Sequence, residues 1–178
     1  VCSSDLGFEY IIIRDQITSL PEPTFSGNIL NLMICLGGGD LLGQGHQTAE
    51  FFSKSGFNVT LVQGPFAKST KQHSRYRVLV NPPDFPMLLA SCDWAITNGG
   101  GCLFEALYLG KPALVLPQTE AELKIATYVK QQSAIMGIGI NEFQTIDLNR
   151  FKEIAKKGKH LVDGKGLERI INIITDLL

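Results

Sequence analysis

The sequence predicts an α/β domain: a Rossmann-like parallel sheet with helices on both faces. From residue 29 onward, short strands that are apolar throughout alternate with helical segments. Strands without a polar face are typical of parallel sheets that are covered on both sides. Turns rich in glycine or proline follow three of these strands, at residues 37–40, 98–101 and 117–120. Because ligands of such sheets bind beyond the carboxyl ends of the strands, we expect the three turns to form a ligand-binding edge.

Each element is indicated by its local pattern. A possible strand at residues 10–13 is followed by a linker at 21–28 that contains Pro and Gly. Continuous apolar runs predict the strands, and helical spacing that ends near a glycine, such as Gly56 or Gly110, predicts the helices. We expect strands over residues 29–36, 58–63, 75–80, 94–97, 113–116 and 134–140, and helices over 46–55, 84–92, 103–109 and 120–132, with two more from about residue 147.

Composition restricts the class of protein. The 178 residues are enough for one domain with a sizeable core, and 44% hydrophobic with 19% charged residues is typical of a globular chain. A net charge of −1, with one basic cluster at residues 156–160, argues against nucleic acid as a partner. No apolar run reaches the roughly 18 residues that span a bilayer. The four cysteines lack metal-ligand spacing, so we expect a reducing, cytoplasmic setting and no metal site.

The most informative motif is Asn98-Gly99-Gly100-Gly101-Cys102-Leu103-Phe104-Glu105, between an expected strand and an expected helix. Glycines at this turn let a ligand approach the backbone, and the start of the helix offers N–H groups that suit a phosphate. Glu105 lies one turn later on the same helix face as Gly101, where it can accept hydrogen bonds from a ribose diol. The motif indicates a nucleotide site, and an ordinary glycine turn with a solvent-facing Glu105 is the alternative.

Other nucleotide signatures are missing. A dehydrogenase fingerprint fails at Leu42, where a third glycine is needed, and the second strand ends at Gln63-Gly64 without an acid. The sequence has no phosphate loop of the G-x-x-x-x-G-K-[ST] type. Cys102 lies at a helix start, where the pKa of a thiol tends to fall, but no histidine is nearby in sequence. We therefore expect Cys102 to line the site.

The chain resembles the C-terminal half of a two-domain glycosyltransferase of the GT-B type. It is most similar to the UDP-sugar hydrolases of pseudaminic acid synthesis and the related spore-coat polysaccharide proteins. The murein glycosyltransferase that uses UDP-N-acetylglucosamine shares the glycine turn followed by Glu. The motifs that carry the resemblance, in this order, lie at residues 10–14, 35–40, 96–107, 110–112, 115–117 and 162–170.

The resemblance implies a domain organisation and a set of site residues. Residues 29–178 would be a Rossmann-like domain that binds a nucleotide sugar, and residues 1–28 the junction to an N-terminal domain. No catalytic residue is expected in this chain, because the family's general base is a histidine of the N-terminal domain. No cofactor is implied beyond the UDP-sugar substrate. The implied contacts are Gly38, Gly39, Gly99, Gly100, Gly101 and Cys102 with the diphosphate, Glu105 with the ribose, Asn81 and Pro82 with the base, and Gln118, Glu120 and Glu122 with the sugar.

The sequence departs from the family at two places. Cys102 stands where the family usually has a hydroxyl residue, and Ala121-Glu122 stands where it usually has Asn-Gln. The expected function is the UDP-sugar-binding domain of a nucleotide-sugar hydrolase in bacterial surface polysaccharide or nonulosonic acid biosynthesis, inactive when isolated. The alternatives are the donor-binding domain of a GT-B glycosyltransferase and a non-catalytic nucleotide-binding module, which the two departures would suit.

Overall fold

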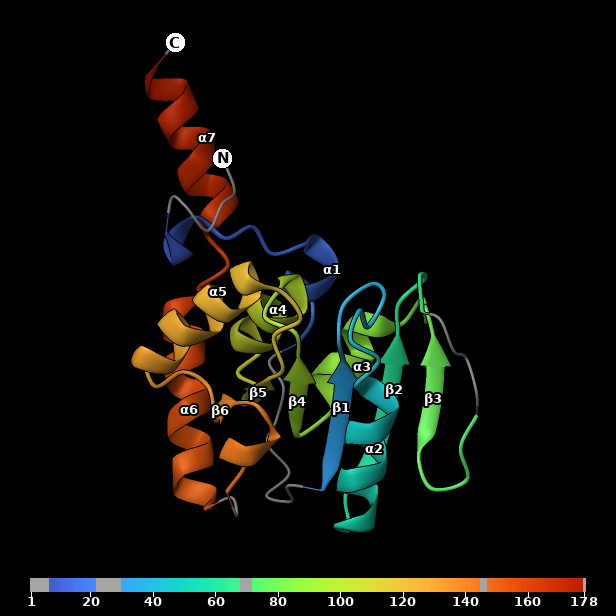
Figure 1. Ribbon diagram of the computed structural model, residues 1–178. Coiled ribbons are helices and arrows are strands. Elements are labelled where there is room, and N and C mark those ends of the chain that lie inside the picture. Colours follow the sequence, from blue (N-terminus) through green and yellow to red (C-terminus); the bar gives the residue numbers. More distant parts are fainter. Residues whose placement is uncertain (1–6, 22–29, 68–71, 145–146, 178) are drawn as a thin grey trace.

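The chain folds around one parallel sheet of six strands. The computed structural model describes residues 7–21, 30–67, 72–144 and 147–177. The strand order is β3-β2-β1-β4-β5-β6 (Figure 1). The strands are β1 (Asn31–Cys35), β2 (Asn58–Gln63), β3 (Arg77–Val80), β4 (Trp94–Thr97), β5 (Ala113–Val115) and β6 (Gly137–Ile138). The order runs outward from β1 in both directions, so the predicted Rossmann-like fold class is confirmed and its topological switch point lies between β1 and β4.

Helices cover both faces of the sheet, as predicted. Side chains of β1 alternate between two apolar clusters: Leu32 and Ile34 belong to one, Met33 and Cys35 to the other. The first cluster includes side chains of α2 (Gly45–Lys54) and α6 (Leu148–Leu161). The second includes side chains of α3 (Phe85–Ser91), α4 (Gly101–Tyr108) and α5 (Glu120–Gln131). Burial on both faces explains why the strands lack a polar alternation.

The N-terminal segment differs from its prediction. The expected strand at residues 10–13 is absent, since a short 3-10 helix, η2 (Phe8–Tyr10), is followed by extended chain and then α1 (Asp15–Thr18). Ile11 and Ile13 bury their side chains in the second cluster without joining the sheet. The apolar run at residues 10–13 thus reflects the burial of Ile11 and Ile13 and not a strand. The expected linker at 21–28 lies almost wholly outside the described residues, and the expected strand at 134–140 shortens to β6 before η3 (Ile140–Glu142).

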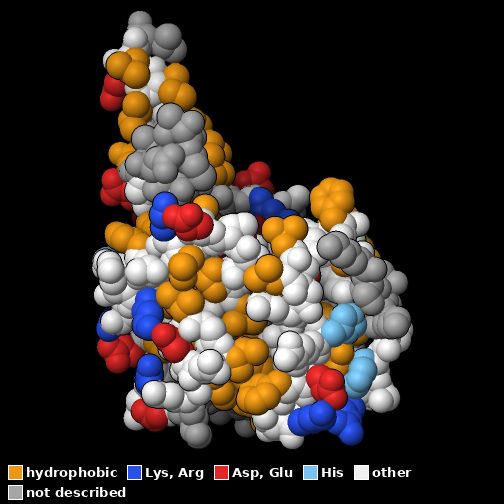
Figure 2. All heavy atoms as spheres, viewed as in Figure 1, with side chains coloured by type: hydrophobic (Ala, Val, Ile, Leu, Met, Phe, Trp, Pro, Cys, Tyr) orange, Lys and Arg blue, Asp and Glu red, His pale blue; other side chains and the backbone are white. Residues whose placement is uncertain are grey.

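The last helix, α7 (Gly166–Asp176), extends away from the body (Figures 1 and 2). Its first turn packs on the N-terminal segment, because Gly166 lies directly against the backbone of Ile11 and a Cβ there would clash. Arg169 donates to the carbonyl oxygen of Glu9 at 2.8 Å and also pairs with Asp163. Beyond this anchor the apolar side of α7 is about half exposed. No helix among the described residues is long and apolar enough to cross a membrane.

Candidate functional site

A cavity of about 460 Å³ opens at the carboxyl ends of β1 and β2, beside the start of α4. We call it the edge cavity. It brings together residues that lie far apart in the sequence and were predicted to contact a nucleotide: Gly38, Asn81, Pro82, Gly101, Cys102 and Glu105. Arg14, Cys35, Gly64 and Phe85 also line it. The cavity therefore occupies the place in the fold where ligands of open α/β sheets bind.

The remaining predicted diphosphate residues lie beside the edge cavity rather than in its wall. Gly99 is buried with a φ of +100°, and a Cβ there would come within 3.0 Å of the Glu122 carbonyl oxygen. This glycine is thus required by the turn itself. A Cβ at Gly101 would meet nothing within 4 Å, and Gly101 lines the cavity. Of the three glycines in the turn, Gly101 presents the backbone that a ligand can reach.

Two helix starts at this edge differ in how their N–H groups are used. The carboxylate of Asp40 accepts from the backbone N–H groups of Gln44 and Gly45, at 2.9 and 2.8 Å, and so caps α2. The cap residue of α4 is Gly100, which has no side chain to offer. The N-terminus of α4 therefore keeps its positive partial charge available to an anion in the edge cavity, whereas that of α2 is already neutralised.

Glu105 is paired within the protein. Its Oε1 lies 2.7 Å from Nε of Arg14, and its Oε2 accepts from Nη2 of Arg14 at 2.8 Å. The guanidinium also stacks over the ring of Phe85, 5.2 Å from the centroid. Only 13% of the Glu105 side chain is exposed. The alternative of a solvent-facing Glu105 therefore fails, and the N-terminal segment contributes a cation to the wall of the cavity.

Burial sets the protonation behaviour of this carboxylate. Desolvation raises the pKa of Glu105 above its ordinary value, and the hydrogen bonds and positive charge of Arg14 oppose the rise without cancelling it. A carboxylate that is poorly solvated gains more from each additional donor than one in water. A ribose hydroxyl group can act as such an additional donor to Glu105.

Two loops support the cavity through backbone contact, which sequence reasoning missed. A Cβ at Gly64 would lie 2.5 Å from the backbone of Gly38, so only glycine permits this approach. The Phe66 N–H group donates to the Gly38 carbonyl oxygen at 2.9 Å. The signal in the sequence is Gly64, a glycine directly after the second strand.

The residues predicted to contact the sugar lie apart from the edge cavity. Gln118 and Glu120 line a second cavity of about 450 Å³. Glu122 accepts from Nδ2 of Asn98 at 2.5 Å and from the Gln118 backbone N–H at 2.7 Å. Its own N–H donates to Thr119, the cap of α5. Glu122 thus ties the glycine turn to the loop before α5, and its carboxylate is engaged by these two donors.

Cys35 and Cys102 lie side by side in the edge cavity. Cys35 ends β1, and Cys102 is in the first turn of α4. Both are free thiols in the wall of the same cavity, and each thiol shifts the pKa of the other. Neither cysteine had been predicted to contact the other, because they are separated by three strands in the sequence.

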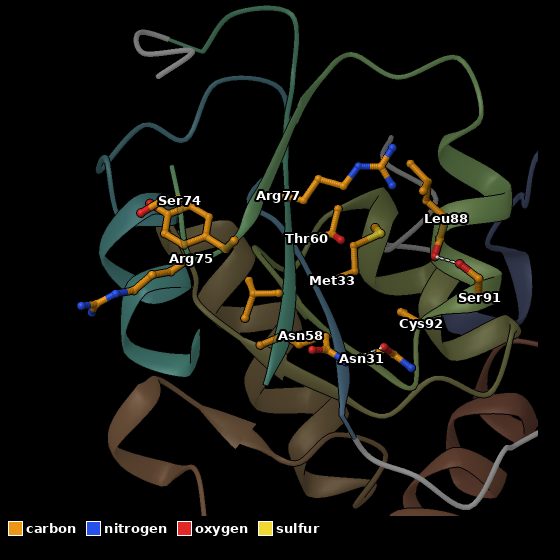
Figure 3. A pocket seen from close by; sticks show the side chains of 13 residues that line it. Asn31, Met33, Asn58, Thr60, Ser74, Arg75, Arg77, Leu88, Ser91 and Cys92 are labelled. Atoms are coloured by element: carbon orange, nitrogen blue, oxygen red, sulfur yellow. Dashed lines mark hydrogen bonds between the residues drawn. The ribbon is translucent and has the colours of Figure 1, made fainter. Parts of the chain in front are cut away.

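A larger cavity of about 610 Å³ lies at the opposite end of the sheet (Figure 3). Its wall includes Asn31, Asn58 and Arg77, which begin β1, β2 and β3. The described residues that line it include no glycine and no residue from the first turn of a helix. Among the described residues, no group of three or more His, Cys, Asp or Glu side chains could hold a metal ion. The edge cavity is therefore the candidate functional site.

The fold defines the class: the chain has the fold of one half of a GT-B glycosyltransferase. The glycotransferase of kitacinnamycin has a TM-score of 0.65 at 18% identity, over 94% of this chain and 48% of that chain. MurG of Acinetobacter baumannii has a TM-score of 0.62 at 14% identity, over 96% of this chain and 55% of MurG. The glycosyltransferase SsfS6 of Streptomyces sp. SF2575, solved with thymidine diphosphate, has a TM-score of 0.56 at 16% identity, over 92% of this chain and 47% of SsfS6.

At the level of sequence, the chain is a homologue of the spore coat polysaccharide biosynthesis protein SpsG of Bacillus subtilis. The two are 27% identical over 96% of this chain, which spans 58% of the length of SpsG. The UDP-N-acetylglucosamine 2-epimerase of Campylobacter jejuni is 34% identical over 54% of this chain and 27% of its own length. No family model matches the sequence. The resemblance to the spore-coat polysaccharide proteins and to MurG is confirmed.

Proposed function

We propose that the edge cavity binds the UDP part of a nucleotide sugar. The observation that carries the proposal is the start of α4, which lacks a side-chain cap and opens onto the cavity one turn before Glu105. A diphosphate is the anion that suits such a helix start, and a ribose is the part of a nucleotide that suits the acid. Support comes from SsfS6, whose structure holds thymidine diphosphate, and from the C. jejuni enzyme, whose substrate is a UDP-sugar.

The proposed arrangement assigns each wall of the cavity a part of the nucleotide. The diphosphate lies over Gly101, Cys102 and Gly38, with Gly39, Gly99 and Gly100 shaping the turns behind them. The ribose diol donates to Glu105, whose carboxylate then accepts hydrogen bonds from both Arg14 and the ribose. The base lies against Asn81 and Pro82, and the hexose extends toward Gln118 and Glu120. Glu122 keeps the position of that loop rather than contacting the hexose.

The protein as a whole is proposed to be a nucleotide-sugar hydrolase that acts in bacterial surface polysaccharide or nonulosonic acid biosynthesis, in the cytoplasm. Homology to SpsG supports the polysaccharide setting. No histidine is among the described residues that line the edge cavity. The general base for hydrolysis is proposed to come from the N-terminal domain. The donor-binding half of a glycosyltransferase is the second candidate, favoured by the fold shared with the kitacinnamycin enzyme. A non-catalytic module that binds nucleotides is the third, suited by Cys102 and Glu122.

An N-terminal domain is the proposed partner of this chain, and α7 is where it would dock. Leu167, Ile171 and Ile174 are 47%, 52% and 53% exposed on one helix that leaves the body. SpsG is longer than the stretch that matches this chain, and the N-terminal segment of this chain already lies against the start of α7. A domain that precedes residue 1 would therefore meet this apolar face.

Calorimetry with UDP and 2′-deoxy-UDP tests the nucleotide proposal. We expect UDP to bind, and Glu105→Ala to weaken UDP binding by about tenfold, the effect of losing a hydrogen bond to a charged group. The preference for UDP over 2′-deoxy-UDP should disappear in Glu105→Ala. Glu153→Ala, at an exposed position on α6, is the control and should leave both affinities unchanged. Failure of UDP to bind, or a preference that survives in Glu105→Ala, would contradict the proposal.

A further inference from the structure

The thiols of Cys35 and Cys102 have no part in the nucleotide proposal beyond lining the cavity. Cys35 is 7% exposed at the end of β1, and β1 pairs with β4 so that Cys35 lies beside Thr97. The chain passes from Thr97 through the glycine turn to Cys102, whose side chain packs against the apolar cluster that contains Cys35. The topology thus brings the two thiols together, and both face the edge cavity.

Cys92 provides an internal comparison. Its side chain is buried, with 6% exposed, directly after α3, and its thiol donates to the Leu89 carbonyl oxygen at 3.2 Å. It lines the large cavity at the opposite end of the sheet and not the edge cavity. Burial raises the pKa of Cys92 to about 12, so it remains a thiol. Cys35 differs, because the neighbouring Cys102 lowers the pKa of the Cys35 thiol against the opposing effect of burial.

We propose that Cys35 and Cys102 form a dithiol modification site in the edge cavity, which a peroxide oxidises to a disulfide that weakens nucleotide binding. The Cys35 thiolate attacks one peroxide oxygen, the O–O bond breaks, and the other oxygen leaves as hydroxide, which gives a sulfenic acid. The Cys102 sulfur then attacks the Cys35 sulfur. The S–OH bond breaks, an S–S bond forms, and the hydroxyl leaves as water with the Cys102 proton. Sulfur gives up two electrons, and the peroxide accepts them.

The consequence for binding rests on the proposed nucleotide site. Cys102 is in the first turn of α4, where the diphosphate is proposed to lie. A disulfide draws the first turn of α4 toward β1, because an S–S bond is much shorter than the contact between two thiols. We expect oxidation to weaken UDP binding about tenfold, and thiol reduction to restore it. Bound UDP should in turn slow oxidation, since it covers the cavity.

The test uses the whole chain with Cys2→Ser as background, so that Cys35, Cys92 and Cys102 are the remaining thiols. After limited treatment with hydrogen peroxide, remaining thiols are alkylated and the unreduced digest is analysed by mass spectrometry. We expect a peptide linked through Cys35 and Cys102 that thiol reduction separates, and an alkylated Cys92. Cys92→Ser, whose hydroxyl can keep the hydrogen bond to Leu89, should form the same link. Cys35→Ala should form none.

Two outcomes overturn the inference. One is recovery of Cys35 and Cys102 as alkylated thiols under peroxide that oxidises a free dithiol of low molecular weight. The other is a linked peptide whose formation leaves UDP affinity unchanged in a chain that binds UDP. Because the linked peptide is detected without any nucleotide, failure of the nucleotide proposal is separable: UDP would then not bind to the reduced chain either, while the disulfide still forms.

Discussion

At the scale of the residue, the pair of Glu105 and Arg14 shows how the fold sets chemistry that the sequence leaves open. The two residues are 91 positions apart, and no local period relates them. The glycine turn predicted that Glu105 faces a ligand, because helix geometry fixes its relation to Gly101. It could not predict Arg14 as the partner, since that contact depends on how the N-terminal segment packs over α4.

The raised pKa of Glu105 predicts a pH dependence of stability. The folded state holds this proton more tightly than the unfolded chain, whose Glu pKa is about 4.3. The free energy of unfolding should therefore fall as pH rises through the interval between the two pKa values. Glu105→Gln removes this titration. Urea unfolding should therefore show that the free energy of unfolding of the variant rises relative to that of the parent as pH rises across that interval. Lys157 lowers the pKa of Glu153, so the free energy of unfolding of Glu153→Gln should fall relative to that of the parent as pH rises. A difference for Glu105→Gln that is constant with pH would refute the prediction.

At the scale of the element, the start of α4 separates structural glycines from an open one. Gly101→Val places a side chain in space where a Cβ meets nothing, so we expect stability to change by less than about 0.5 kcal/mol. The same side chain fills the proposed diphosphate position, so UDP binding should fall by more than tenfold. Thermal unfolding and calorimetry measure the two effects. Gly99→Ala provides the contrast: its positive φ and the Glu122 backbone predict a loss of about 1–3 kcal/mol in stability. Undiminished binding in Gly101→Val would contradict the arrangement.

The anchor of α7 is the second element that can be tested. Arg169 donates to Asp163 and lowers the pKa of that carboxyl to about 2. Its stabilising contribution is present above the unfolded pKa of about 3.9 and is lost as pH falls toward about 2. Both side chains are about one-third exposed, so Asp163→Asn should cost no more than about 1 kcal/mol at neutral pH. Urea unfolding should show that the difference in the free energy of unfolding between the parent and Asp163→Asn disappears as pH falls toward about 2. Asp84→Asn, at an exposed carboxylate that does not cap α3, is the control and should leave the free energy of unfolding at neutral pH unchanged.

At the scale of the whole molecule, strand pattern and turn position were enough to predict the sheet. The strands at 58–63 and 94–97 agree with β2 and β4 residue for residue, because each is an apolar run bounded by clear turn signals. The segment at 10–13 misled, since its run of apolar residues is typical of a strand, whereas Ile11 and Ile13 are buried in the second cluster without joining the sheet. The apolar side of α7 was also missed. Its spacing predicts a helix but does not reveal that the helix leaves the body.

The exposed side of α7 predicts the behaviour of this chain in solution. Leu167, Ile171 and Ile174 present apolar surface that a preceding domain would cover in a longer protein. In the chain by itself the surface is bare, so we expect its average mass in sedimentation equilibrium to rise with protein concentration. Replacing Ile171 and Ile174 together by Ser keeps helix propensity nearly unchanged and should hold the chain monomeric. Met87→Ser, at a 55% exposed apolar position on α3, should behave like the parent. Equal masses for the parent and the double variant at every concentration would show that α7 does not drive association.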